Sequence, residues 1–226
     1  RTAIINSGFR FPTTRMTLNL APADVKKEGP VYDLPMAIAI LMTDGAIQAD
    51  FETGEHRAAE YVVAGELALD GRVRSVRGVI SLALMTKKLG KRGVIIPADN
   101  AAEAAAVDGI EVRAASTLGE VVTFLNGQGE LPLIQPVDAD SLIAEAPAEI
   151  DFVDIKGQEA AKRAVTIAAA GGHNLLMIGP AGTGKTMMAK ALPGILPPLS
   201  RDEALEVTRI YSSVGKVRHG ESLITH

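Results

Sequence analysis

The stretch NLLMIGPAGTGKT, residues 174–186, decides the fold of the second half of this 226-residue chain. Its first five residues, 174–178, are largely apolar, which is typical of a strand buried on both faces of a sheet. The loop GPAGTGKT follows at once, and the pattern predicts a helix over residues 186–192. Strand, glycine-rich loop and helix form the context in which the pattern G-x-x-x-x-G-K-[ST] cradles phosphate groups.

Each residue type in this loop has a chemical reason. Gly182 and Gly184 allow backbone turns that aim successive N–H groups at phosphate oxygens. Lys185 can reach the β- and γ-phosphates, and the Thr186 hydroxyl can bind the Mg²⁺ that bridges them. We therefore predict ATP or ADP with Mg²⁺ as ligands. The predicted contacts come from Gly179, Pro180, Ala181, Gly182, Thr183, Gly184, Lys185 and Thr186, with Thr186 as the metal ligand.

The segment before the loop supports the same prediction. DFVDIKGQ, residues 151–158, leads into an expected helix over residues 157–172 that ends in two glycines. This part of the chain resembles the AAA+ ATPases, in which an I-x-G-Q segment lines the adenine pocket. The resemblance implies base contacts from Val153, Ile155 and Gly157.

The hydrolytic residues of such an ATPase have no counterpart after the loop. No run of four apolar residues followed by Asp-Glu occurs beyond Thr186, and the sensor residues and arginine finger cannot be assigned. We therefore expect a truncated chain that binds nucleotide without turnover. A final helix is expected over residues 199–211, with Ser200 as N-cap and Glu203 in the capping-box position.

Strands and helices alternate in the first half of the chain. This order predicts an α/β or α+β domain over residues 1–126, a linker over 127–150, and the start of the ATPase domain, with a parallel three-layer sheet, over 151–226. Expected strands cover residues 16–20, two parts of 61–73, 93–97 and 110–112; expected helices cover 34–41, 79–89, 100–107 with Asn100 as cap, and 117–125.

Two stretches of the first half resemble the proteolytic domain of Lon, a domain of the ribosomal S5 domain 2-like type. The first is KKEGPVYDLPMAIAIL, residues 26–41, and the second is residues 65–100. In Lon a nucleophilic serine follows the Gly-Pro turn, and Val31 stands at that position here. The position of the Lon dyad lysine is held by Ile80. A Ser-Lys dyad needs a hydroxyl and an amine, so we expect no proteolysis from a domain that is also clipped at its front.

The whole chain resembles the ComM/YifB branch of magnesium-chelatase-like AAA+ proteins. LPGILPPL, residues 192–199, and EALEVTRIYS, residues 203–212, carry this resemblance. It implies an ATPase that assembles into a hexameric ring and moves along DNA in branch migration during recombination and natural transformation. The alternatives are a magnesium-chelatase motor subunit, an ATP-dependent protease, which Val31 and Ile80 oppose, and a nucleotide-gated assembly module.

Composition narrows the class of protein further. The chain has no cysteine, which fits a reducing, cytoplasmic setting, and no apolar run of about 18 residues that could cross a membrane. The net charge of −4 does not indicate a strongly basic nucleic-acid surface. A local basic cluster could contact DNA or another subunit, but we favour the simpler interpretation that its residues lie on the solvated faces of a strand and a helix. Its members are Arg72, Arg74, Arg77, Lys87, Lys88, Lys91 and Arg92.

Overall fold

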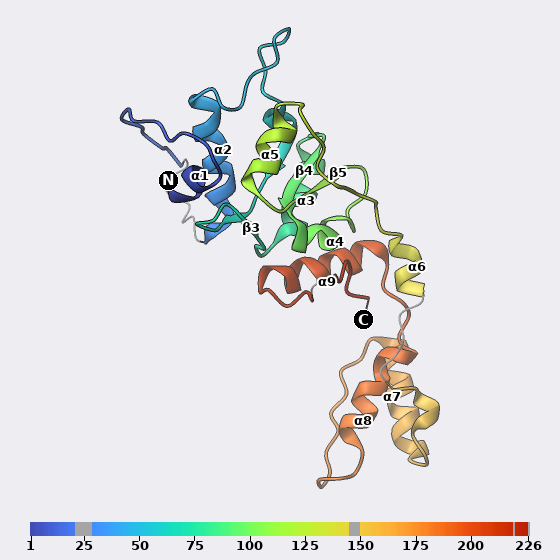
Figure 1. Ribbon diagram of the computed structural model, residues 1–226. Coiled ribbons are helices and arrows are strands. Elements are labelled where there is room, and N and C mark those ends of the chain that lie inside the picture. The colour runs from blue at the N-terminus through green and yellow to red at the C-terminus, as the bar shows by residue number, and fades with distance from the viewer. Residues whose placement is uncertain (21–28, 145–149, 219, 226) are drawn as a thin grey trace. The chain divides into compact units, whose positions relative to one another are not determined.

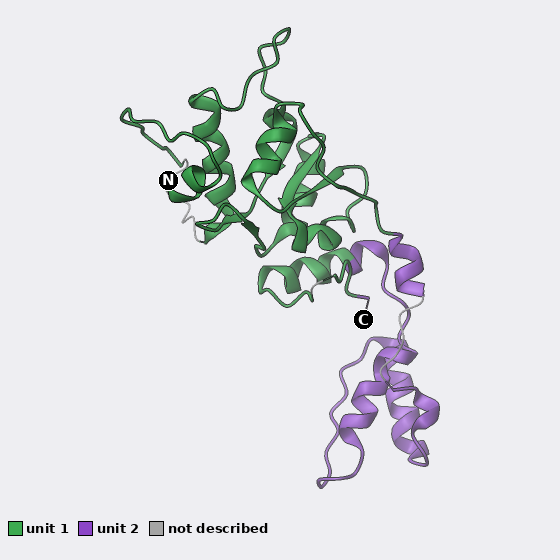
Figure 2. Ribbon diagram, viewed as in Figure 1, with its two compact units in different colours: residues 1–137, 205–224 green, residues 138–204, 225–226 purple. Residues whose placement is uncertain are grey.

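The computed structural model describes residues 1–20, 29–144, 150–218 and 220–225. Figure 1 shows the course of the chain, and Figure 2 divides it into two compact units. The first unit contains Arg1–Val137 and Leu205–Ile224, and the second contains Asp138–Ala204 with Thr225. The helix α9 (Arg201–Ser213) supplies residues to both units.

A four-stranded sheet forms the centre of the first unit. Its order is β1-β4-β5-β6, in which β1, β4 and β5 are parallel and β6 is antiparallel to β5. This mostly parallel sheet confirms the α/β class that the alternation predicted. The strands are β1 (Tyr61–Val63), β4 (Gly93–Pro97), β5 (Glu111–Ala115) and β6 (Leu133–Ile134), and β2 (Glu66–Leu67) pairs with β3 (Val73–Arg74) in a separate hairpin.

Helices cover both faces of this sheet (Figure 1). In β4, Val94 and Ile96 pack in one apolar cluster with α3 and α4, whereas Ile95 packs in another with α2 and α5. Successive side chains of a strand point to opposite faces, so one strand serves two cores. The helices are α1 (Thr2–Asn6), α2 (Asp33–Thr43), α3 (Val79–Lys88), α4 (Ala101–Ala104) and α5 (Leu118–Leu125), and the 3-10 turns are η1 (Pro30–Tyr32), η2 (Arg57–Glu60) and η3 (Ala98–Asn100).

The start of α5 is fixed by a capping box. The Thr117 hydroxyl accepts the backbone N–H of Glu120, and the Glu120 carboxylate accepts the backbone N–H of Thr117. The expected cap at Asn100 was wrong in its chemistry. Asn100 precedes α4, but its side chain forms hydrogen bonds of 2.9 and 3.0 Å with the backbone N–H and carbonyl of Val76.

The strand expected over residues 16–20 is absent from the described structure. Met16 packs against the cluster formed by α2 and α5, but Leu18 is 54% exposed. An alternating pattern gives a strand only where a neighbouring strand can take up its backbone hydrogen bonds. The apolar alternation here reflects the packing of Met16 on an irregular segment.

The expected linker, residues 127–150, contains regular structure where it is described. β6 adds a strand to the sheet of the first unit, and α6 (Ala139–Ala144) follows it. Residues 145–149 lie outside the described residues, as do residues 26–28 of the stretch that resembles Lon. Within the described ranges, no helix is both long enough and apolar enough to cross a membrane.

The second unit is mainly helical. The helix α7 (Glu159–Gly171) ends at Gly172, which has the left-handed conformation common after helices. The predicted strand over residues 174–178 was wrong, because this stretch pairs with no strand of the described chain and Ile178 is 87% exposed. The remaining elements are α8 (Lys185–Ala191) and the turns η4 (Phe152–Asp154) and η5 (Leu192–Ile195).

Candidate nucleotide site

The glycine-rich loop lies between residues 174–178 and α8. Gly182 and Gly184 have φ angles of 82° and 79°, a region that disfavours residues with a Cβ atom. The two glycines of the motif therefore take the backbone conformations that the sequence predicted for them. Gly184 is also the residue that precedes the first turn of α8.

The ammonium group of Lys185 folds back onto the loop. Its Nζ donates hydrogen bonds to the carbonyl oxygens of Gly179 at 2.8 Å and Pro180 at 2.6 Å, and it lies 3.2 Å from Oγ1 of Thr183. The Thr183 hydroxyl in turn donates to the Pro180 carbonyl at 3.0 Å. The ammonium group of Lys185 thus bonds to several oxygen atoms of the loop that lie close together.

Thr186 occupies the first turn of α8 and is exposed. Its position next to Lys185 places a hydroxyl and an ammonium group at the same end of the helix. A hydroxyl of this kind can act as one oxygen ligand of Mg²⁺, which keeps several waters and takes few protein ligands beside nucleotide phosphates. The residues present therefore fit a magnesium–nucleotide ligand.

The residues expected at the base lie in different environments. Ile155 is 6% exposed and packs with Val165 of α7 and Met188 of α8, whereas Val153 is 69% exposed. Gly157 is exposed and has a φ angle of 69°. The turn η4 that carries Val153 is capped by Asp151, whose carboxylate accepts the Val153 N–H at 2.8 Å. The side chain of Ile155 is therefore buried in the core. Any contact of this residue with a base would come from its backbone.

An apolar cavity of about 410 Å³ adjoins the loop. Ala161, Ala164 and Val165 of α7 form one side. Residues 175–180 form another, and Gln158, Thr183, Lys185 and Met188 complete the lining. Val153 and Ile155 do not line this cavity. The cavity therefore lies between the loop and α7, and none of the residues 153–155 lines it.

Gln158 is a loop contact that the sequence motif did not assign. Its Nε2 donates to the backbone carbonyl of Thr183 at 2.9 Å. A Cβ atom at Gly184 would lie 3.3 Å from the same nitrogen. The I-x-G-Q pattern contains Gln158, so the signal was present, but a pattern does not tell which of its side chains reaches the loop.

The two positions that the resemblance to Lon assigned to a catalytic dyad are apolar in the first unit. Ile80 is fully buried in the cluster formed by α3 and α4, and Val31 is partly buried against the same cluster. The backbone carbonyl of Val31 accepts the N–H of Gly65 at 3.1 Å. Ser75 and Ser81, the nearby hydroxyls that the sequence offers, are both exposed. The side chains of Val31 and Ile80 therefore pack in an apolar cluster, and neither can act as a nucleophile or a base.

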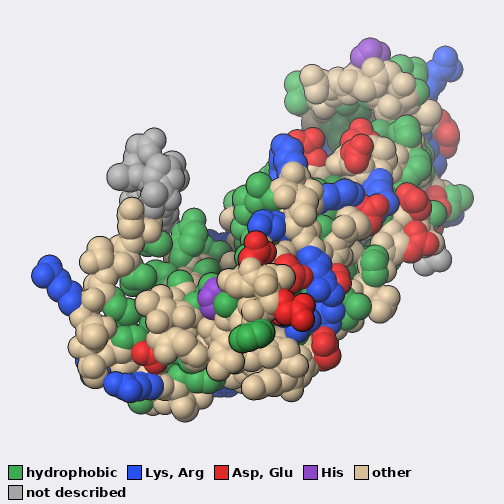
Figure 3. Space-filling model, turned by 90° about the horizontal axis from the view of Figure 1, so that it is seen from above, with side chains coloured by type: hydrophobic (Ala, Val, Ile, Leu, Met, Phe, Trp, Pro, Cys, Tyr) green, Lys and Arg blue, Asp and Glu red, His purple; other side chains and the backbone are tan. Residues whose placement is uncertain are grey.

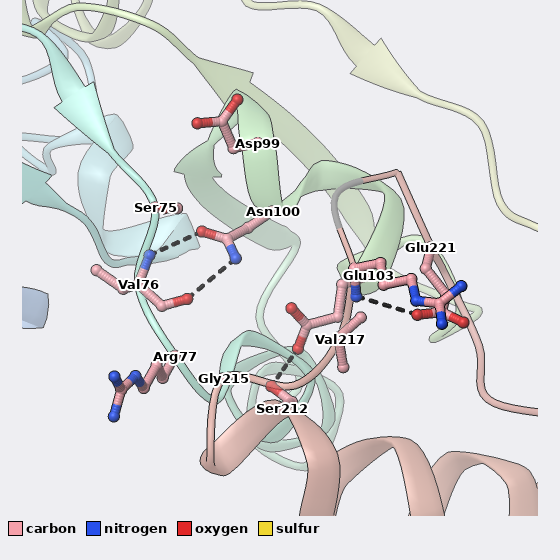
Figure 4. A pocket seen from close by; sticks show the side chains of 11 residues that line it. Ser75, Val76, Arg77, Asp99, Asn100, Glu103, Ser212, Gly215, Val217 and Glu221 are labelled. Carbon is pink, nitrogen blue, oxygen red and sulfur yellow. Dashed lines mark hydrogen bonds between the residues drawn. The ribbon is translucent and has the colours of Figure 1, made fainter.

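A polar cavity of about 240 Å³ also lies in the first unit (Figure 4). Asn100 of η3 and Glu103 of α4 line it, and Ser212 lines it from the end of α9. The Glu103 carboxylate accepts the Ser212 hydroxyl and the Ile80 N–H. Asn100 also forms two hydrogen bonds with the backbone of Val76, another residue that lines the cavity. These polar side chains therefore form hydrogen bonds that join neighbouring segments of the first unit.

The basic cluster is extensively paired. Arg72 contacts Asp70 at 2.7 Å, and Lys87 contacts Asp108. Arg92 contacts Glu60 at 3.0 Å and Glu111 at 2.9 Å, Arg74 lies 3.8 Å from Glu66, and Lys91 donates to the Ala59 carbonyl. Figure 3 shows basic and acidic side chains side by side on the viewed face. Acidic partners therefore offset much of the cluster's positive charge.

Two family models match the chain. One, described as "Subunit ChlI of Mg-chelatase", matches residues 1–100, and the other, described as "Magnesium chelatase, subunit ChlI", matches residues 151–226. The second range contains the glycine-rich loop. Both halves of the chain thus fall in the magnesium-chelatase class.

Individual relatives narrow the class. The chain is 45% identical over 214 residues to YifB of Escherichia coli, which covers 95% of the chain and 40% of that protein. It is 45% identical over 215 residues to the competence protein ComM of Haemophilus influenzae, with coverages of 95% and 41%. An uncharacterized protein of Mycobacterium tuberculosis is 43% identical over 225 residues, with coverages of 100% and 43%. The chain therefore belongs to the magnesium-chelatase-like proteins of the ComM/YifB type, and it spans less than half the length of these relatives.

Proposed function

We propose that this chain carries the nucleotide-binding part of a AAA+ ATPase, with ATP or ADP and Mg²⁺ held at residues 179–186. The observation that most strongly supports this function is the placement of Lys185, whose ammonium group lies against the carbonyls of Gly179 and Pro180. The ammonium exchanges these neutral acceptors for phosphate oxygens when nucleotide binds. Hydrogen bonds between ionised groups are stronger than those to neutral carbonyls, so the exchange favours binding.

The other loop residues have matching roles. Gly182 and Gly184 let the backbone amides approach the phosphates, and Thr186 supplies a hydroxyl to Mg²⁺, which offsets the charge of the β- and γ-phosphates. Val153, Gly157 and the backbone of Ile155 contact the base. The apolar lining of the neighbouring cavity lowers the local dielectric around these charges, which strengthens their interaction.

The test is a titration of this chain with fluorescent ADP and ATP in Mg²⁺. Lys185→Ala removes the cation and is expected to weaken binding by at least about ten-fold, as the loss of a hydrogen bond between charged groups implies. Lys190→Ala, a change on the same helix away from the loop, is the matched control and should bind like the wild type. Equal affinities of the wild type and the Lys185→Ala variant would overturn the proposal.

The activity of the full-length protein is proposed as an ATP-driven, ring-forming motor that moves along DNA. The similarity to a protein named for competence supports DNA as the substrate. The measurement is ATPase activity of the full-length protein with single-stranded, duplex and branched DNA. Stimulation that is greatest with branched DNA supports branch migration, and the absence of any stimulation by DNA contradicts it.

A magnesium-chelatase motor is the second candidate, because both matching family models carry the description ChlI. ATPase stimulation by a porphyrin-chelatase partner, with none by DNA, would favour this candidate. The first unit is proposed to share the shape of the Lon proteolytic domain without its chemistry. Val31 and Ile80 support this view, since neither side chain can attack or accept a proton.

A further inference from the structure

Gln158 has a backbone conformation that needs an explanation. It is the one non-glycine residue with a positive φ angle, 57°, within the described ranges. This region is costly for most residues, and such outliers persist where the surrounding structure requires them. Gly157 before it has a φ of 69°, so the chain makes two successive left-handed steps at the start of α7.

The left-handed step sends the side chain of Gln158 to the glycine-rich loop. Its Nε2 donates to the Thr183 carbonyl at 2.9 Å, and its own backbone carbonyl accepts the Lys162 N–H at 3.0 Å. Gln158 thus begins α7 and contacts the loop at once. It lines the same cavity as Thr183 and Lys185.

The contact fixes the direction of one peptide group. The carbonyl of Thr183 and the N–H of Gly184 belong to the same planar trans peptide, so they point in opposite directions. When Gln158 holds the carbonyl, the Gly184 N–H is directed away from Gln158. Gly184 has no side chain, which leaves room for Nε2 of Gln158. A Cβ atom at Gly184 would lie 3.3 Å from this nitrogen.

We infer that Gln158 is a positioning residue of the nucleotide site: its side-chain amide holds the Thr183–Gly184 peptide so that the Gly184 N–H is presented to a nucleotide phosphate. The inference rests on the proposed function and adds a residue to it. Gln158 itself does not touch the phosphate. It removes the need for the loop to reorder this peptide when ligand binds, which lowers the cost of binding.

The test compares Gln158→Gly with the wild type in the binding of fluorescent ADP and ATP. Glycine takes a φ of 57° without strain, but it has no amide to hold Thr183. If the side-chain contact matters, Gln158→Gly weakens binding by about ten-fold, the size of one lost hydrogen bond to a charged group. Its unfolding midpoint in urea should not fall, because the strained conformation is relieved.

Two further variants separate the possible causes. Gln158→Glu keeps the length of the side chain but cannot donate at neutral pH, so it should bind as weakly as Gln158→Gly. Gln158→Asn tolerates the left-handed conformation but has a shorter reach, so it should restore little affinity.

The outcomes distinguish this inference from the proposed function. Wild-type binding that is lost in Lys185→Ala and weakened in Gln158→Gly supports both. Wild-type binding that is lost in Lys185→Ala but unchanged in Gln158→Gly overturns the role of Gln158 and leaves the proposed function intact. A wild-type chain that binds neither ADP nor ATP overturns both.

Discussion

The hydroxyl of Ser212 donates a hydrogen bond to the carboxylate of Glu103, which lies 109 residues earlier in the chain. Both residues are buried, with exposed fractions of 2% and 6%. The same carboxylate oxygen accepts the backbone N–H of Ile80 at 3.0 Å, and the Ser212 carbonyl accepts the N–H of Gly78 at 3.2 Å. The end of α9 is therefore tied to the first turn of α3 within the first unit.

Ser212→Ala is expected to destabilise the first unit by about 1–3 kcal/mol, because Glu103 loses a donor while it stays buried. Urea unfolding at neutral pH measures the change. Ser213→Ala is the matched control, since the Ser213 hydroxyl is exposed and donates a hydrogen bond to the Ile210 carbonyl of its own helix. The control should remain within about 0.5 kcal/mol of the wild type. Equal effects of the two changes would show that the contact with Glu103 adds no stability.

Thr117→Ala is expected to cost about 1 kcal/mol of stability, the usual effect of removing an N-cap side chain. The reason is the loss of the bond from the Glu120 N–H to Oγ1 of Thr117 at 3.2 Å. Thr123→Ala on the same helix is the comparison. Its hydroxyl bonds to the Gly119 carbonyl on an exposed face, so its removal should be close to neutral. A larger loss at Thr123 than at Thr117 would be inconsistent with the capping box.

Glu111 is expected to make the stability of the first unit depend on pH. Burial pushes the pKa of its carboxyl up, but hydrogen bonds from Arg92 and Arg113 outweigh burial and hold this pKa below the ordinary value of 4.5. A carboxylate with a lowered pKa in the folded state stabilises the fold above its unfolded pKa. That contribution is lost as the pH falls through the folded value.

Glu111→Gln is the variant that tests this dependence. The difference in free energy of unfolding between the wild type and the variant should be largest near neutral pH and shrink below pH 4.5, the ordinary value for this carboxyl. The exposed Glu52, changed to Gln, serves as the comparison variant. A difference for Glu111→Gln that stays constant with pH would contradict the role of the arginine contacts.

Thr186→Ala is expected to weaken the binding of ATP by about ten-fold in Mg²⁺ and to leave binding in EDTA unchanged. The hydroxyl acts through the metal, so its loss matters only when the metal is present. Thr186→Ser retains the hydroxyl and should restore the Mg²⁺ effect. An equal loss of affinity with and without Mg²⁺ would mean that Thr186 supports the loop rather than the metal.

Local sequence signals predicted much of the fold. The apolar run of β4 and the helix α3 form where the patterns indicated, and Ser200 with Glu203 forms the predicted capping box before α9, in which the Glu203 carboxylate accepts the Ser200 N–H at 2.8 Å. These signals act between residues a few positions apart, so the sequence contains all of the interacting groups. The glycines of the loop are also a local signal, because each is required by the backbone conformation at its own position.

Other features could not be predicted because they depend on distant partners. Asn100 looked like a helix cap, but the buried backbone of Val76 offered it both a donor and an acceptor. The stretch over residues 174–178 has the composition of a buried strand but pairs with no strand of the described chain. The positive charge of the cluster that includes Arg72 and Arg92 is offset by acids that the sequence pattern could not assign to it.

The sequence by itself determined the alternation of strands and helices, the glycine-rich loop with its lysine and threonine, and the apolar residues at positions 31 and 80. Only the tertiary structure decided that Gln158 reaches Thr183, that Ser212 meets Glu103, and which acids pair with the basic cluster. The physical reason is range. Backbone conformation and periodicity are set by neighbours in sequence, whereas a hydrogen bond or an ion pair between distant segments exists only after the chain has brought them together.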